Sequence, residues 1–198
     1  MGEIKETRTY LSRDEVNALP VRRYEGEVRV VADPAGAAEA LKAILQESVV
    51  GFDTETRPAF RPGESYPPSL AQIATARAVY LFQVRHRALA EAVAEILAAR
   101  HVVKAGVGLA DDLKALKKVL EFAEKSTVDL GAVAKRQGIG QSGVRNLTAL
   151  FLGFRIPKGT KTSNWARSTL TPQQVAYAAT DAWACRELYV RFRNLGFL

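Results

Sequence analysis

Three expected β-strands follow one another closely in the first half of the chain, and their spacing limits the possible folds more than any other feature. The runs at 49–55, 70–75 and 78–84 are mostly apolar and have the length of strands. A loop rich in Pro and Gly at 57–68 separates the first two, and a short turn separates the second and third. Strands joined in this way pair as an antiparallel meander.

The second half of the chain alternates between helix and strand signals. The expected elements are a helix at 89–99, a strand at 102–104, a helix at 109–122, a strand from Val128, and helices from Gly131 that end in a long one at 172–193. A meander followed by such alternation predicts an α/β fold with a mixed sheet flanked by helices. A ribonuclease-H-like arrangement is the favoured member of this class, although periodicity alone does not separate it from other α/β folds.

The N-terminal region is predicted to lie outside the main domain. Residues up to about Gly26 are polar and mixed, and Ser12 to Glu15 have the form of a capping box, which predicts a short helix before Pro20. A strand at 27–32 follows, and then a helix at 34–46 with Asp33 as its N-cap. A chain of 198 residues fits one domain. We therefore expect an N-terminal extension at 1–26 and a single domain at 27–198.

The composition is that of an ordinary globular protein, with 47% hydrophobic and 25% charged residues. No apolar run approaches the roughly 20 residues that cross a bilayer, and the first residues lack the pattern of a signal peptide. Cys185 is the only cysteine, so no internal disulfide can form and a reducing compartment is indicated. These features predict a cytoplasmic protein.

The positive charge is concentrated in one stretch of the chain. The sequence has 28 Lys and Arg against 21 Asp and Glu, yet residues 131–179 contain no acidic residue. The basic residues of this acid-free stretch are Lys135, Arg136, Arg145, Arg155, Lys158, Lys161 and Arg167. Such a stretch is typical of a surface that binds a polyanion, and a solvated face is an equally good interpretation of composition alone.

Two acidic residues interrupt the first strand of the expected meander. Asp53 and Glu55 are two positions apart, so both carboxylates project from the same face of the strand. Two like charges side by side on a sheet destabilise the fold unless a cation or a proton compensates for them. The alternative is that the strand ends there and both groups are solvated.

Asp181 lies in the apolar stripe of the last helix. At about 100° per residue, its neighbours on this side are Ala178, Ala184, Cys185, Leu188 and Phe192. A buried carboxylate is rare unless it is paired or bound to a metal. Tyr177 is one turn earlier on the same side, so its hydroxyl and Asp181 can face one site. A salt bridge to a buried arginine is the alternative.

The helix at 109–122 carries two neighbouring acids on different sides. Asp112 is on the flank of its leucine stripe, and Asp111 is near the opposite, solvated side. His86 and His101 are isolated, and the sequence lacks the GxxxxGK[ST] loop that holds phosphates. The remaining candidate ligands are carboxylate oxygens, which suit Mg²⁺ or Mn²⁺.

Several segments together resemble the motifs of the DEDDy-type 3′-5′ exonucleases, the family that includes Werner-type exonucleases and ribonuclease D. The segments are 50–55 (VGFDTE) with 70–73 (LAQI), 104–112 (KAGVGLADD), 163–165 (SNW) and 177–182 (YAATDA), in the order that the family has. The resemblance extends over roughly residues 49–193. The tyrosine four positions before the last aspartate is the mark of the DEDDy subgroup.

The resemblance implies a role for each matching residue. Asp53, Glu55, Asp112 and Asp181 would bind two divalent metal ions, Mg²⁺ or Mn²⁺, and Tyr177 would orient the attacking water. The family often has an aromatic residue where this chain has Asp111. The implied activity is removal of nucleotides from the 3′ end of a nucleic acid by a two-metal mechanism.

The substrate strand and its contacts are less specified. Lys158, Lys161 and Arg167 are candidates for contacts with backbone phosphates, and Trp165 is a candidate for stacking on a base, although core packing also explains a tryptophan. Nothing in the sequence separates DNA from RNA. A non-catalytic nucleic-acid-binding or scaffold module on the same fold is the alternative function.

Overall fold

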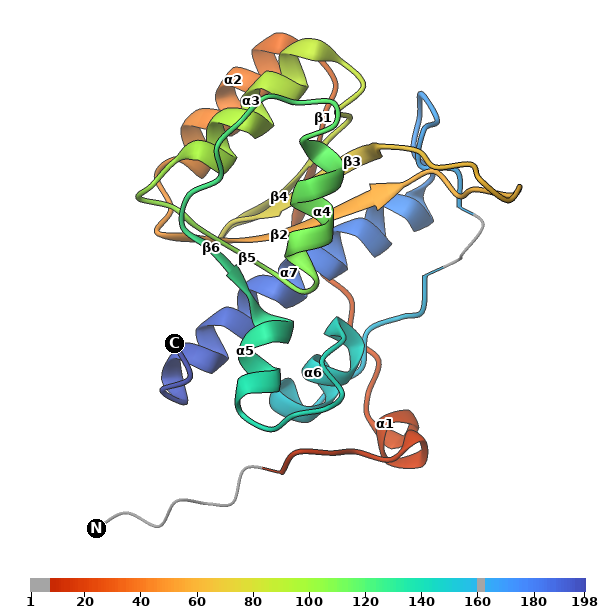
Figure 1. Ribbon diagram of the computed structural model, residues 1–198, viewed down its shortest axis with the longest axis vertical. Helices are drawn as coiled ribbons and strands as arrows, with labels where there is room; N and C mark the ends of the chain where they lie inside the picture. Colours follow the sequence, from red (N-terminus) through yellow and green to blue (C-terminus); the bar gives the residue numbers. More distant parts are fainter. Residues whose placement is uncertain (1–7, 160–162) are drawn as a thin grey trace.

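The computed structural model describes residues 8–159 and 163–198, which form a mixed six-stranded sheet between two layers of helices (Figure 1). The strand order is β1-β4-β3-β2-β5-β6. The bounds are β1 Glu27–Val31, β2 Val49–Thr56, β3 Pro68–Ala74, β4 Ala78–Phe82, β5 Val103–Gly106 and β6 Thr127–Asp129. The pairs β2–β3 and β3–β4 are antiparallel, and the other pairs are parallel. The predicted α/β class, mixed sheet and meander are confirmed.

The helices cover both faces of the sheet. One face packs against α2 (Pro34–Ile44), α3 (Arg87–Ala98) and α4 (Leu109–Leu116). The other face packs against α5 (Leu130–Arg136), α6 (Val144–Leu152) and α7 (Pro172–Asn194), the longest helix. No helix in the described part of the chain is long and apolar enough to span a membrane.

The central strand β2 divides its side chains between the two layers, as period two requires. Val50 and Phe52 belong to the core on the α2–α4 side, and Val49 belongs to the core on the α5–α7 side. Gly51 faces α7 so closely that a Cβ atom there would lie 1.9 Å from the carbonyl oxygen of Ala182. The backbones of β2 and α7 are therefore in direct contact at this point.

One predicted helix is shorter than expected. The run 109–122 is helical only from Leu109 to Leu116. The chain then tightens into turns in which Lys118 N donates to Ala115 O over 3.2 Å and Val119 N donates to Leu116 O over 2.9 Å. Bonds from residue i to residue i+3 are common where a helix ends. The helical spacing of apolar residues in the sequence therefore extends beyond the end of the helix itself.

The N-terminal segment is fastened to the domain by hydrogen bonds. Helix α1 (Arg13–Ala18) has the predicted capping box at Ser12. Beyond it, the amide of Arg22 donates to Arg155 O over 2.9 Å, and the amide of Tyr24 donates to Thr180 Oγ1 over 3.0 Å. These bonds hold residues 22–24 against the first half of α7 and the chain just after α6.

Candidate active site

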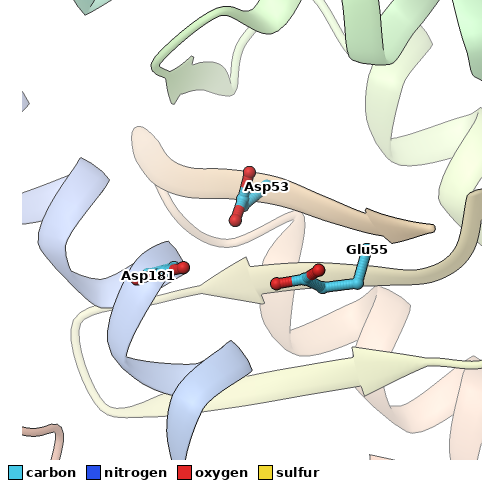
Figure 2. A group of neighbouring side chains, drawn as sticks. All are labelled: Asp53, Glu55 and Asp181. Carbon is cyan, nitrogen blue, oxygen red and sulfur yellow. The ribbon is translucent and has the colours of Figure 1, made fainter. Parts of the chain in front are cut away.

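Three of the predicted acids converge where β2 faces α7. Asp53 and Glu55 come from β2 and Asp181 comes from α7, and Figure 2 shows their carboxylates pointing toward one another. One oxygen from each lies within 4.8 Å of the others. This spacing suits a shared divalent cation, since each residue can offer one oxygen ligand.

Local structure accounts for this convergence. Asp53 and Glu55 project from the face of β2 that α7 covers, because they continue the alternation of Val49 and Gly51. Asp181 is only 5% exposed, as its place in the apolar stripe predicted. The direct contact of α7 with Gly51 brings Asp181 close to the sheet.

Burial raises the pKa values of the clustered carboxylates, and neighbouring negative charges add to the rise for Asp53 and Glu55. Burial raises the pKa of Glu55 to about 8, with the charges of Asp181 and Asp112 acting in the same direction. Burial also raises the pKa of Asp181 to about 6, opposed by the neighbouring Tyr177 hydroxyl and by Arg145. The pKa of Asp53 lies well above its ordinary value because of burial and the charges of Asp181, Asp112 and Glu55. The cluster therefore favours a proton or a cation over bare negative charge.

Asp112 approaches this cluster from α4 but is not one of the three converging groups. Its Oδ1 accepts a hydrogen bond from Thr54 Oγ1 over 2.5 Å. Burial raises the pKa of Asp112 to about 6, against the effect of this hydrogen bond. Asp112 is half-buried and Asp111 is exposed, so the predicted difference between the two is confirmed.

Tyr177 is half-buried one turn before Asp181, and its ring lies against two other segments. Its ring centroid is 6.1 Å from that of Trp165. A Cβ atom on Gly159 would lie 2.5 Å from Cζ of Tyr177, so the chain at 159 passes directly over the ring. Burial and the charge of Asp181 raise the pKa of Tyr177, which keeps its hydroxyl protonated.

Gln174 is a residue of this site that the sequence did not point to. Its Nε2 donates to Ser163 Oγ over 2.8 Å and to Asn164 O over 3.1 Å, which joins the segment at 163–165 to the first turn of α7. The capping box between Thr171 and Gln174 was the available signal.

The residues predicted to contact nucleic acid have different surroundings. Lys158 and Arg167 are exposed, and Trp165 is 6% exposed and packs in the core with Ala178 and Leu70. Lys161 lies outside the described residues.

Comparison with known proteins identifies the family. The family model for 3′-5′ exonucleases matches residues 28–196. The chain is 31% identical over 154 residues to the mouse bifunctional 3′-5′ exonuclease/ATP-dependent helicase WRN, covering 75% of this chain and 11% of that protein. It is 28% identical over 170 residues to ribonuclease D of Haemophilus influenzae, covering 81% of this chain and 40% of that enzyme.

The chain belongs to the 3′-5′ exonuclease family. The EXO domain of Nibbler from Aedes aegypti has the same fold, with a TM-score of 0.75 at 24% identity over 90% of this chain and 93% of that one. The ribonuclease-H-like fold predicted for the sequence is thereby confirmed. The chain spans less than half the length of the two curated relatives named above.

The acidic cluster of this exonuclease domain fits a divalent metal centre. Oδ1 of Asp181 is buried and has no hydrogen-bond partner within residues 8–159 and 163–198. A buried carboxylate oxygen is ordinarily bonded, and a cation between the three acids would satisfy it. All the groups are oxygen donors, as hard divalent cations prefer.

Proposed function

We propose that this chain hydrolyses phosphodiester bonds at the 3′ end of a nucleic acid and releases nucleoside monophosphates. The observation that carries the proposal is the convergence of Asp53, Glu55 and Asp181 within 4.8 Å, next to Tyr177. Family membership supports the same reaction.

Four carboxylates would hold two metal ions, Mg²⁺ or Mn²⁺. Asp53 is the candidate to touch both, Glu55 and Asp181 complete the converging set, and Asp112 would join it from α4. When bound, two such ions would lower the pKa of a water molecule and offset the charge that develops on phosphorus and on the leaving 3′ oxygen. Thr54 would orient Asp112 through its hydrogen bond.

Tyr177 would orient the attacking water. Its raised pKa keeps the hydroxyl protonated, so it can donate or accept a hydrogen bond but does not serve as a base. The contacts with Trp165 and Gly159 restrict the ring, which favours one position of the hydroxyl beside Asp181.

The acid-free stretch would bind the strand. Lys158, Lys161 and Arg167 are the proposed phosphate contacts, and Trp165 is the proposed aromatic contact next to Tyr177. The substrate is DNA, RNA or both.

We also propose that residues 27–198 are the exonuclease domain, that 1–26 extend it, and that the protein works in the cytoplasm.

The decisive experiment uses 5′-labelled DNA and RNA oligonucleotides, single- and double-stranded, with Mg²⁺, Mn²⁺ or EDTA. A ladder that shortens from the 3′ end only in the presence of metal supports the proposal. Binding without cleavage under every metal condition would support the non-catalytic module instead. Cutting of a closed circular single strand would point to an endonuclease.

A further inference from the structure

A groove of about 560 Å³ lies beside Tyr177, and the N-terminal segment forms one of its walls. Arg23 comes from that segment, Pro157 and Lys158 from the chain after α6, and Pro172 from the start of α7. Arg23 and Lys158 are both exposed, and no acidic side chain lines the groove within the described part of the chain. The groove therefore combines positive charge with apolar walls.

Backbone hydrogen bonds fix Arg23 at the rim of this groove. Arg22 N donates to Arg155 O over 2.9 Å, and Arg155 N donates to Pro20 O over 2.9 Å. Tyr24 N donates to Thr180 Oγ1 over 3.0 Å. Since both neighbours of Arg23 are held, ordering its backbone on binding costs little, and its side chain starts from the rim of the groove.

The chemistry of the groove suits part of a single strand. Volumes of about 300–1,000 Å³ hold groups of small-molecule size, so a nucleotide fits and a duplex does not. Arg and Lys side chains bind phosphates, and the proline walls suit the apolar face of a base or sugar. Tyr177 lines the groove, whereas none of the four candidate ligand acids does, so the groove would take nucleotides next to the one that is removed.

We propose that this groove, which has Tyr177 in its lining, binds the single strand next to the nucleotide that is removed, and that Arg23 contacts a backbone phosphate there. This inference rests on the proposed function, because the strand is the proposed substrate. It makes the N-terminal segment part of the substrate site.

The test compares Arg23→Gln with Arg22→Gln, which removes the same charge from the adjacent residue. The guanidinium of Arg22 is 5.5 Å from the ring centroid of Phe154, so its side chain is already engaged and is a matched control. Binding of 5′-labelled single-stranded oligonucleotides is measured by fluorescence anisotropy in EDTA, which prevents cleavage, over a series of salt concentrations.

Arg23→Gln should lower the slope of log affinity against log salt by about 0.7, and Arg22→Gln should leave it unchanged. A dinucleotide, which is too short to reach the groove, should bind equally well to both variants. Equal losses of affinity in the two variants, or no loss in Arg23→Gln, would overturn the inference. If the wild-type protein bound no single strand at all, both this inference and the proposed nucleic-acid substrate would be wrong.

A second inference comes from a buried amide beside the acidic cluster. Gln72 on β3 is fully buried, and neither Oε1 nor Nε2 has a hydrogen-bond partner among the described residues. Such a group is costly to bury, so it calls for a hydrogen-bond partner in the working protein.

The register of the sheet places this amide beside Asp53. Gln72 is directly opposite Asp53 in the antiparallel pair β2–β3, so their side chains lie on the same face, under α7. Its other neighbours on that face, Leu70 and Leu81, are apolar core residues. Of the two residues directly opposite Gln72 in the sheet, Asp53 is the polar one.

We propose that Gln72 is a positioning residue whose Nε2 donates to the Asp53 carboxylate when that carboxylate holds a divalent cation. Such an outer hydrogen bond fixes the orientation of a ligand, and its removal lowers metal affinity about 10- to 100-fold. In the metal-free protein the buried amide of Gln72 then has no hydrogen-bond partner, which lowers the stability of that state.

The test measures Mn²⁺ affinity by calorimetry, together with the melting temperature in EDTA, for Gln72→Leu and Gln72→Met. Metal affinity should fall at least tenfold, while the metal-free melting temperature stays the same or rises by about 2–4 °C, because an unbonded buried amide has been removed.

Gln83→Leu is the matched control, since Gln83 is a buried glutamine whose Nε2 donates to Arg167 O over 3.1 Å and to Ser168 O over 3.2 Å. It should lower the melting temperature and leave Mn²⁺ affinity unchanged. Unchanged Mn²⁺ affinity in both Gln72 variants would overturn the proposed role of Gln72 and leave the proposed metal centre intact. A wild-type protein that bound no Mn²⁺ would overturn the metal centre as well.

Discussion

The acidic cluster and the acid-free basic stretch are both groups of like charges, but the structure treats them in opposite ways. Asp53, Glu55 and Asp181 lie close together where α7 covers β2. Burial raises the pKa of all three, and the charges of neighbouring acids add to the rise for Asp53 and Glu55. Lys158 and Arg167 are exposed. Charges that are concentrated out of water need a compensating ion, whereas charges in water are screened. Changes in the first group should therefore act on catalysis in large steps, and changes in the second should act on binding in small, salt-dependent ones.

The largest expected effect is loss of turnover when one acid is neutralised. Replacing any of Asp53, Glu55, Asp112 or Asp181 by its amide should lower kcat by at least ~10³, because the cluster acts as a unit. The measurement is single-turnover cleavage of a labelled oligonucleotide at saturating metal.

Asp111→Asn is the control for this contrast, because Asp111 is exposed next to Asp112. It should keep most of the activity. An inactive Asp111→Asn with an active Asp112→Asn would reverse the roles assigned to the two residues.

A smaller effect is expected when the ring of Tyr177 is displaced. A Cβ atom on Gly159 would lie 2.5 Å from Cζ and 2.6 Å from the hydroxyl oxygen of Tyr177, so Gly159→Ala should shift the ring. We expect kcat to fall about tenfold with little change in KM, since the water is no longer held in position while the strand stays bound. Gly140→Ala is the control because its added Cβ meets nothing within 4 Å. Equal kinetics in the two variants would remove the chain at 159 from the positioning of Tyr177.

The acidic cluster should also make the stability of the metal-free protein depend on pH. The pKa of Glu55 is raised from 4.5 to about 8 and that of Asp181 from 3.8 to about 6, so the folded protein holds protons that the unfolded chain has released. Stability should therefore fall as pH rises from about 5 to about 8, and Mn²⁺ should oppose the fall. Lys104 acts in the opposite direction and above that window, because burial lowers its pKa from 10.5 to about 8. Between these two values the unfolded chain holds a proton that the folded protein has released, so this residue makes stability rise with pH there.

Melting temperatures in EDTA at pH 5, 6, 7 and 8 test this dependence, and Asp181→Asn should make it shallower. A melting temperature that rises over this range in EDTA would mean that the carboxylates are compensated without metal.

The smallest expected effect concerns the basic stretch. Lys158→Gln combined with Lys161→Gln should raise KM at moderate salt, leave kcat at saturation nearly intact, and lower the salt slope by about 0.7 for each phosphate that the variant no longer binds. Lys161 lies outside the described residues, so its part in this prediction comes from the sequence. Unchanged KM and slope would make the stretch a solvated surface.

Local patterns correctly predicted the helices, the strands and the orientation of the acidic residues, because all of these follow from the regular spacing of apolar residues along a helix or strand. The stripe of α7 correctly predicted that Asp181 is buried, and the face of α4 correctly separated Asp112 from Asp111. The predicted C-terminal end of α4 was wrong, because the helical spacing of apolar residues continues through the turns that follow Leu116.

Other features depend on contacts between distant segments, so local patterns do not give the position of these residues. Gln72 lies in the segment 70–73 that resembles the family, but only the register with β2 places it beside Asp53. Arg23 is one of several arginines in a polar N-terminal region, and only the bonds to Arg155 and Thr180 hold its neighbours at the groove.

The converging acids are far apart in the chain, with Glu55 on β2 and Asp181 on α7. A chain emerging from the ribosome therefore has Asp53 and Glu55 long before it has Asp181 or the helix that packs on Gly51. A partly synthesised or C-terminally cleaved chain lacks a complete cluster. Under the proposed function, hydrolysis therefore requires α7 and can begin only after this last helix has docked on the sheet.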